Sequence, residues 1–148
     1  MCGPRERVEE NLGVRHGRWG EAVAAELLRR EGYEILEKNS RPSKRDRRLE
    51  IDIIAYDKRR DLLVFVEVKQ HKTHSGRERR LRSIDRRKRD LLRTACRSWL
   101  AKNRWQGSFR FDVVEVFGAP ETRRRPETDH IERVRLFERG DRFVNWAD

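Results

Sequence analysis

Two short apolar runs joined by a charged turn constrain this chain more than any other feature of its sequence. Residues 49–56 and 62–69 are rich in Ile, Val, Leu and Phe, which is typical of strands. The polar stretch between them, residues 58–61, predicts a tight turn. The two runs are therefore expected to pair as an antiparallel hairpin.

A symmetric hairpin gathers acids and a lysine on one face. In this register Asp52 lies directly across from Glu67, and Glu50 lies across from Lys69. Opposed side chains share a face, as do side chains two residues apart on one strand. Two opposed carboxylates about 5 Å apart repel each other, so a cation is expected between them.

The residue types indicate which cation this is. Mg²⁺ or Mn²⁺ accepts a carboxylate pair, with water and phosphate oxygens completing its shell. We therefore predict Asp52 and Glu67 as metal ligands, with Lys69 orienting an attacking water or stabilising charge on a phosphate. Cross-strand salt bridges with Lys69 and nearby arginines are the alternative. The very apolar surroundings of both acids favour a functional site.

Glu21 is the fourth candidate catalytic residue. It shares a helix face with Ala24, Ala25 and Leu28, and an acid leading such a stripe is unusual where a helix packs on a sheet. It is predicted to reach the edge of the same site. The alternative is an acid in a first helical turn, where the helix dipole stabilises it.

The charge of the chain indicates its partner. Its 148 residues are enough for one domain with a core, and they include 37 Lys and Arg against 26 Asp and Glu, a net charge of +11. Such a balance attracts polyanions. The basic segment 72–89 predicts a rim that binds nucleic-acid phosphates, unless it is simply a solvated face. The predicted contacts are Arg77, Arg79, Arg80, Arg82 and Lys88, although snorkelling would also explain Lys88.

The remaining periodicities predict a single α/β domain. Its elements follow the order α-β-β-β-α-β-β, a mixed central sheet flanked by helices. Residues 1–15 are expected to be a flexible arm, 16–138 the domain and 139–148 a tail. The expected helices span residues 17–31, ending at Gly32, and 83–101, with Ser83 as N-cap and Asp85 in the first turn. The expected strands outside the hairpin span residues 33–36, 109–117 and 130–137.

Several classes of protein are disfavoured. Cys2 and Cys96 form no disulfide framework, so reduced cytosolic thiols are expected. No stretch has transmembrane length and the first 14 residues lack an apolar signal core, which favours a cytoplasmic protein that does not enter the membrane. His71 and His74 lack the neighbouring ligands that a zinc site needs.

Six motifs can be read along the chain: WGE at residues 19–21, GYEILEKN at 32–39, EIDIIA at 50–55, VFVEVK at 64–69, Lys88, and RFDVV at 110–114. Together they resemble the YraN-like family of uncharacterised bacterial proteins. The resemblance spans about residues 16–137, and two features depart from it. Leu49 stands where the family usually has Gly, and the loop before it is longer and more basic.

That family is similar to the restriction-endonuclease-like, or PD-(D/E)xK, superfamily, and most of all to archaeal Holliday-junction resolvases. The resemblance implies an α-β-β-β-α-β core and Mg²⁺-dependent cleavage of DNA. It matches Glu21 to the first-helix acid, Asp52 to the metal-binding aspartate, and Glu67 and Lys69 to the ExK pair. By analogy with the resolvases it also implies a two-fold homodimer.

Three functions follow from this sequence. The first is a DNA endonuclease that acts on branched structures or ends. The second is a catalytically inactive nucleic-acid-binding module of the same fold, although a pure binder gains nothing from acids that face phosphates. The third is a basic accessory protein bound to an acidic partner. Only the first requires a divalent metal, whereas simple phosphate binding depends chiefly on monovalent salt.

Overall fold

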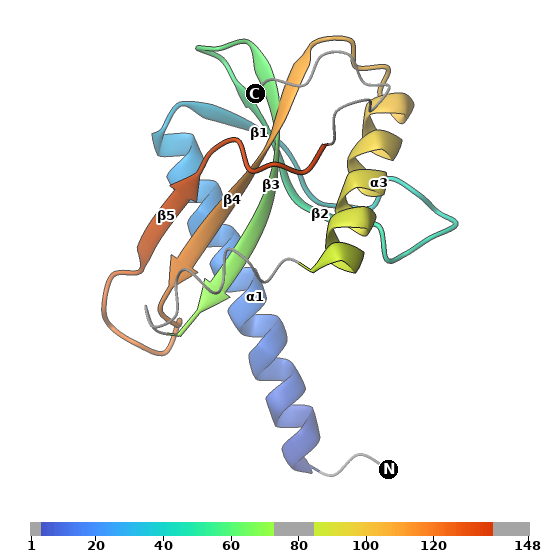
Figure 1. Ribbon diagram of the computed structural model, residues 1–148. Helices are drawn as coiled ribbons and strands as arrows, with labels where there is room; N and C mark the ends of the chain where they lie inside the picture. The colour runs from blue at the N-terminus through green and yellow to red at the C-terminus, as the bar shows by residue number, and fades with distance from the viewer. Residues whose placement is uncertain (1–3, 73–84, 138–148) are drawn as a thin grey trace.

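The computed structural model describes residues 4–72 and 85–137, which form a mixed sheet with a helix on each face (Figure 1). This is the α/β architecture that the sequence predicts, with its elements in the predicted order. The elements are α1 (Pro4–Arg30), β1 (Tyr33–Ser40), β2 (Ile51–Asp57), β3 (Leu62–His71), α3 (Arg86–Lys102), β4 (Ser108–Phe117) and β5 (Glu127–Ile131).

The strands lie in the sheet in chain order, from β1 at one edge to β5 at the other. Neighbouring strands are antiparallel except for β3 and β4, which are parallel. Two parallel neighbours need a long crossover, and the connection that contains α3 provides it. The C-terminal ends of β3 and β4 consequently lie at the same end of the sheet (Figure 1).

The hairpin has the predicted register. Its ladder runs from the pair Asp57–Leu62 to the pair Ile53–Val66, around a turn at residues 58–61. Asp57 stabilises this turn because its Oδ1 accepts hydrogen bonds from the backbone N–H groups of Arg59 (3.1 Å) and Arg60 (3.3 Å).

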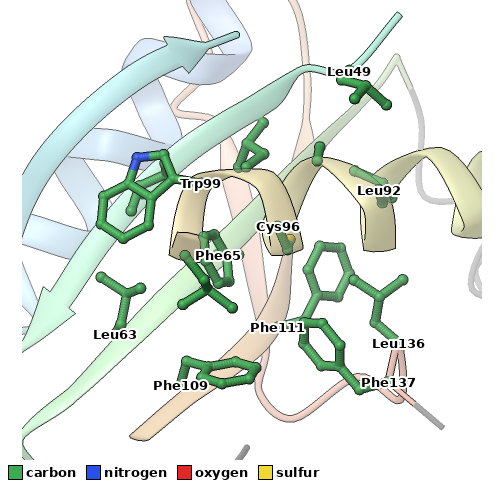
Figure 2. Packing of buried hydrophobic residues seen from close by; sticks show 14 of the residues in the cluster. Leu49, Leu63, Phe65, Leu92, Cys96, Trp99, Phe109, Phe111, Leu136 and Phe137 are labelled. Atoms are coloured by element: carbon green, nitrogen blue, oxygen red, sulfur yellow. The ribbon is translucent and has the colours of Figure 1, made fainter. Parts of the chain in front are cut away.

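Each face of the sheet buries its own apolar cluster. On one face, Ala24, Ala25 and Leu28 of α1 are fully buried, as their spacing predicts, against residues such as Val64 and Val66. On the other face α3 covers a more aromatic core, in which Leu49 also lies (Figure 2). This second core includes Phe65, Leu92, Cys96, Trp99, Phe109, Phe111, Leu136 and Phe137.

The first helix is longer than predicted. The sequence before Gly17 has no apolar stripe and suggested a loose arm, but α1 begins at Pro4. Proline suits the first position of a helix, and the following Arg and Glu residues are good helix formers. In Figure 1 this part of α1 extends past the sheet. Within the described residues, no helix combines the length and apolarity needed to cross a lipid bilayer.

The second helix begins later than predicted. Asp85 is its N-cap rather than a first-turn residue, because the Asp85 carboxylate accepts a hydrogen bond of 2.8 Å from the backbone N–H of Lys88. Ser83, the predicted cap, lies outside the described residues.

The last strand, β5, begins and ends earlier than predicted: it spans Glu127–Ile131 instead of residues 130–137. Arg133 has a positive φ of 57°, which a continuing strand does not allow. The Arg133 backbone N–H instead donates to Asp112 Oδ1 (3.0 Å), and that of Val134 donates to the Phe111 carbonyl (2.8 Å). The chain thus leaves the sheet while Leu136 remains in the core.

Candidate functional site

Asp52 lies where the pairing of β2 and β3 ends. Just past the last pair of the ladder, the backbone N–H of Val68 donates a hydrogen bond of 2.8 Å to Asp52 Oδ2. A side-chain carboxylate thus serves as the acceptor where a continuing ladder would supply a backbone carbonyl. This bond fixes Asp52 beside the strand segment that contains Glu67 and Lys69.

Glu67 is the most enclosed of the candidate acids, with its side chain only 6% exposed. Two lysines face the same carboxylate oxygen. Lys69 Nζ lies 3.7 Å from Glu67 Oε1, and Lys88 Nζ lies 3.4 Å from it. Buried charges need such compensation. Lys88 comes from the first turns of α3, so its position depends on how that helix packs rather than on the hairpin.

Asp52 is held in an environment that disfavours its charge. Burial is the main cause, and repulsion by the Glu67 carboxylate adds to it, so that the pKa of Asp52 is raised to about 8. The hydrogen bond from Val68 acts in the opposite direction without cancelling these effects, and Glu21 adds further repulsion. A cation between the two acids would stabilise the ionised form.

Glu21 approaches the same acids from α1. Its pKa is also raised, chiefly by burial, and repulsion by Glu50 and Glu67 contributes. A hydrogen bond with Asn39 partly offsets these effects. The helix can come this close because it has Gly20 at the contact, where an added Cβ would lie 3.1 Å from Gln70 Cβ. The structure therefore brings together Glu21, Asp52, Glu67 and Lys69, the four residues that the sequence singles out.

Two contacts at this site were not predicted. Asn39, at the end of β1, has a positive φ of 49°, a conformation that Asn adopts more readily than most residues. Its sequence position next to the basic loop gave no sign of a partner on α1. The ion pair of Lys88 with Glu67 is the second, since the sequence indicates only snorkelling or a phosphate contact for Lys88.

A buried acid on β4 extends the polar row beside the site. Glu115 pairs with Lys69 in the parallel register and is 1% exposed. One of its oxygens lies 3.3 Å from His71 Nε2, and the other, Oε2, has no hydrogen bond to any described residue. The predictions did not include Glu115, because its sequence neighbours are apolar and nothing nearby marks the row it joins.

The donor set suits a hard divalent cation. Carboxylate oxygens are the ligands that Mg²⁺ and Mn²⁺ prefer, and Mg²⁺ commonly uses one or two carboxylates together with water and substrate phosphates. The repulsion between Asp52 and Glu67 is the observation that fits such an ion. Over residues 4–72 and 85–137, no group of three or more His, Cys, Asp or Glu side chains is arranged to hold a metal.

The predicted nucleic-acid contacts are divided by the limits of the described chain. Lys88 lies at the site, where it is paired with Glu67. Arg77, Arg79, Arg80 and Arg82 lie outside the described residues.

A second polar cluster, on the α1 face, is structural in character. Arg110 and Asp112 are two residues apart on β4, almost fully buried, and joined by hydrogen bonds of 2.9 and 3.0 Å. His130 Nε2 lies 2.7 Å from Asp112 Oδ2, and Arg110 donates to the Tyr33 hydroxyl at 2.6 Å. These contacts join β1, β4 and β5 on the α1 face, whereas Glu67 lies on the opposite face of the sheet, next in register to Asp112.

The similarity of this chain to other proteins agrees with the motifs. The model of the uncharacterised protein family UPF0102 matches residues 20–116. A UPF0102 protein of Rhodopirellula baltica is 35% identical over 142 residues, covering 88% of this chain and 81% of the relative. A UPF0102 protein of Acetivibrio thermocellus is 42% identical over 103 residues, covering 68% and 74% respectively. The chain therefore belongs to the uncharacterised protein family UPF0102, the YraN-like family that its motifs resemble.

Proposed function

We propose that this protein is a Mg²⁺- or Mn²⁺-dependent endonuclease that hydrolyses phosphodiester bonds in DNA. The observation that carries the proposal is the convergence of Asp52 and Glu67 beside Lys69, with Glu21 approaching from α1. The cost of placing these acids together is understandable if they hold a cation. The resemblance to junction resolvases favours branched DNA or DNA ends as the substrate.

Each side chain has a distinct task in this proposal. Asp52 and Glu67 would hold the cation, which when bound lowers the pKa of water and neutralises charge on the attacked phosphate. Lys69 would orient the attacking water or stabilise the charge that develops on the phosphate oxygens. Glu21 would assist at the edge of the site. Lys88, together with Lys69, would hold the Glu67 carboxylate in place between two ammonium groups.

DNA is the polyanion that best fits the whole chain. The net charge of +11 lowers the cost of bringing phosphates to a site that contains three acids. In the same proposal two copies of the chain form a two-fold dimer, since symmetric cuts in a four-way junction need two sites. Sedimentation with and without junction DNA tests this, and a species of single-chain mass under both conditions would contradict it.

Cleavage of a panel of labelled DNAs tests the proposed activity. Duplex, single strand, flap and four-way junction would be incubated with Mg²⁺, Mn²⁺ or EDTA. Wild type would be compared with Asp52→Asn and Lys69→Met, and with Glu34→Gln as a control that removes an exposed acid on β1. The proposal expects metal-dependent cutting that is lost in the first two variants only.

The same cleavage experiment can instead indicate the alternative function, a catalytically inactive nucleic-acid-binding module. That function is indicated if no DNA is cut while DNA still binds with an affinity that EDTA does not change. Cutting that survives Asp52→Asn would point to a contaminating nuclease.

A further inference from the structure

A basic groove lies at the end of the sheet where the C-terminal ends of β3 and β4 meet. Its volume is about 500 Å³. Four of its lining residues are cations, and Glu127 is its one lining acid among the described residues. The cations are Lys72, Arg123, Arg124 and Arg125.

The loop that carries the three arginines is anchored at several points. Gly118, with a φ of +131°, donates from its N–H to the His71 carbonyl (2.8 Å), and its own carbonyl accepts from Gln70 Nε2 (2.5 Å). Further along the loop, Thr122 Oγ1 donates to the Ala119 carbonyl (2.9 Å). These bonds fix the base from which the arginines project.

A contact with α1 anchors the same loop from the other side. Glu121, next to Thr122, lies 2.6 Å from His16 Nε2, and this contact lowers the pKa of Glu121. Glu121, two residues before Arg123, is therefore already paired with His16.

The arginines themselves are exposed. Arg123, Arg124 and Arg125 form no ion pair or hydrogen bond with any residue of the described ranges, and all three face solvent. Three adjacent guanidinium groups repel one another and are strongly attracted to a partner with closely spaced negative charges. Guanidinium groups match phosphate oxygens in a bidentate manner.

The groove begins at Lys72, three residues beyond Lys69 and just past the end of β3. Lys69 and His71 are two residues apart on β3, about 7 Å along the strand, and they share a face. His71 pairs with Phe117, which lines the groove, and the next residue, Lys72, lines it too. Duplex DNA carries one phosphate per about 3.4 Å of axis on each strand, so a bound strand reaches both places within a few nucleotides.

We propose that this groove binds the sugar–phosphate backbone of the DNA that is cut at Asp52 and Glu67, an inference that rests on the proposed function. The contacts are to phosphates, so the groove positions the DNA without reading its sequence. Its contribution is catalysis-independent and sensitive to monovalent salt. It also lies outside the basic segment 72–89 except for Lys72 itself.

Binding of a labelled four-way junction and a labelled duplex in EDTA, over a range of NaCl concentrations, tests this inference. The test variant replaces Arg123, Arg124 and Arg125 with Ala. The control replaces Arg29, Arg30 and Arg59 with Ala. These arginines are exposed at the opposite end of the sheet, and their replacement removes the same total charge. Circular dichroism melting would verify that both variants fold.

The slope of the logarithm of the DNA-binding constant against the logarithm of the salt concentration is negative. We expect it to become shallower by about 2–3 in the test variant and by less than about 1 in the control. Equal effects in both variants would overturn the inference, since the arginines would then act only through total charge. An unchanged affinity in the test variant would also overturn it and leave the groove to an acidic protein partner.

The two proposals fail separately. If wild type cuts DNA while the groove variant binds like the control, the groove inference is wrong and the nuclease stands. If the groove variant alone loses binding but wild type cuts nothing with Mg²⁺ or Mn²⁺, the groove inference stands and the nuclease does not.

Discussion

Asp52 lies in a poor environment for a charge, although the proposed metal site needs its carboxylate ionised. Its carboxylate accepts a backbone hydrogen bond, yet burial and the neighbouring Glu67 keep its pKa near 8. Such strongly shifted acids cluster at functional sites, because stability is sacrificed there for chemistry. The effect of the Asp52 charge on stability can be measured by replacing this one residue, and the measurement needs no substrate.

Replacing Asp52 with Asn is expected to stabilise the metal-free protein at pH 8.5. The folded pKa of Asp52 lies above its unfolded value, so its contribution to stability is present at low pH and is lost as the pH rises through about 8. Asn keeps an acceptor for the Val68 N–H without the charge. We expect a gain on the order of 2 kcal/mol or more at pH 8.5 and a clearly smaller gain at pH 5, measured by urea denaturation. A variant that is less stable at both pH values would show that the charge is already compensated.

Lys88 offers a second test at the scale of one residue. Replacing it with Met removes one of two ammonium groups beside Glu67 while keeping the apolar stem. We expect DNA cleavage to fall about tenfold or more, with DNA binding nearly unchanged, because the loss is electrostatic and local. Lys102→Met, at the far end of α3, is the matched control. Equal losses in both variants would assign Lys88 to general attraction of DNA.

At the scale of elements, the strands are joined by the buried cluster around Arg110. Asp112 accepts from the Arg110 guanidinium and from the Arg133 backbone, and it lies beside His130, so one carboxylate connects β4 with the chain after β5. These hydrogen bonds outweigh the effect of burial and lower the pKa of Asp112. The cluster stabilises the sheet that positions the β2–β3 hairpin.

Replacing Asp112 with Ala is expected to lower the free energy of unfolding by about 3–5 kcal/mol. The change leaves the Arg110 charge buried without its main partner, and such losses are large. Thermal or urea denaturation measures the effect. Glu132→Ala, which removes a more exposed acid of the same cluster, should cost much less. Similar costs for both changes would mean that Arg110 is compensated mainly from elsewhere.

The hairpin is the element that sequence determines most fully. The turn at residues 58–61 sets the register in which the two apolar runs pair, and that register places Asp52 near Glu67. Elements set by tertiary contacts were less predictable. The positive φ of Arg133 ends β5 early because its N–H bonds to Asp112, which no local pattern indicates.

The same distinction applies within the site. Glu67 and Lys69 could be placed together from strand periodicity alone. The contact of Lys88 with Glu67 depends on where α3 lands after the crossover, and that of Asn39 with Glu21 depends on how α1 packs beside β1. Both contacts join distant parts of the chain, so spacing in the sequence does not reveal them.

The molecule as a whole places the acids that we propose to bind a cation within a strongly basic chain. The net charge of +11 and the groove arginines attract a polyanion, while the few acids that face the site repel it. A metal-dependent nuclease needs both the acids and the basic surface, whereas a protein that only binds DNA gains nothing from acids that face phosphates. The central claim is therefore that Asp52 and Glu67 form one divalent-cation site.

Titration of Mn²⁺, followed by electron paramagnetic resonance at pH 6 and pH 8.5, tests that claim most directly. It needs no substrate, and Asp52→Asn, Glu67→Gln and the control Glu34→Gln would be compared with wild type. Because the metal requires ionised carboxylates, we expect tighter binding at pH 8.5 than at pH 6, in line with the raised pKa of Asp52. Binding should be lost in the two site variants and kept in the control. Equal Mn²⁺ binding by wild type and Asp52→Asn at pH 8.5 would contradict the account.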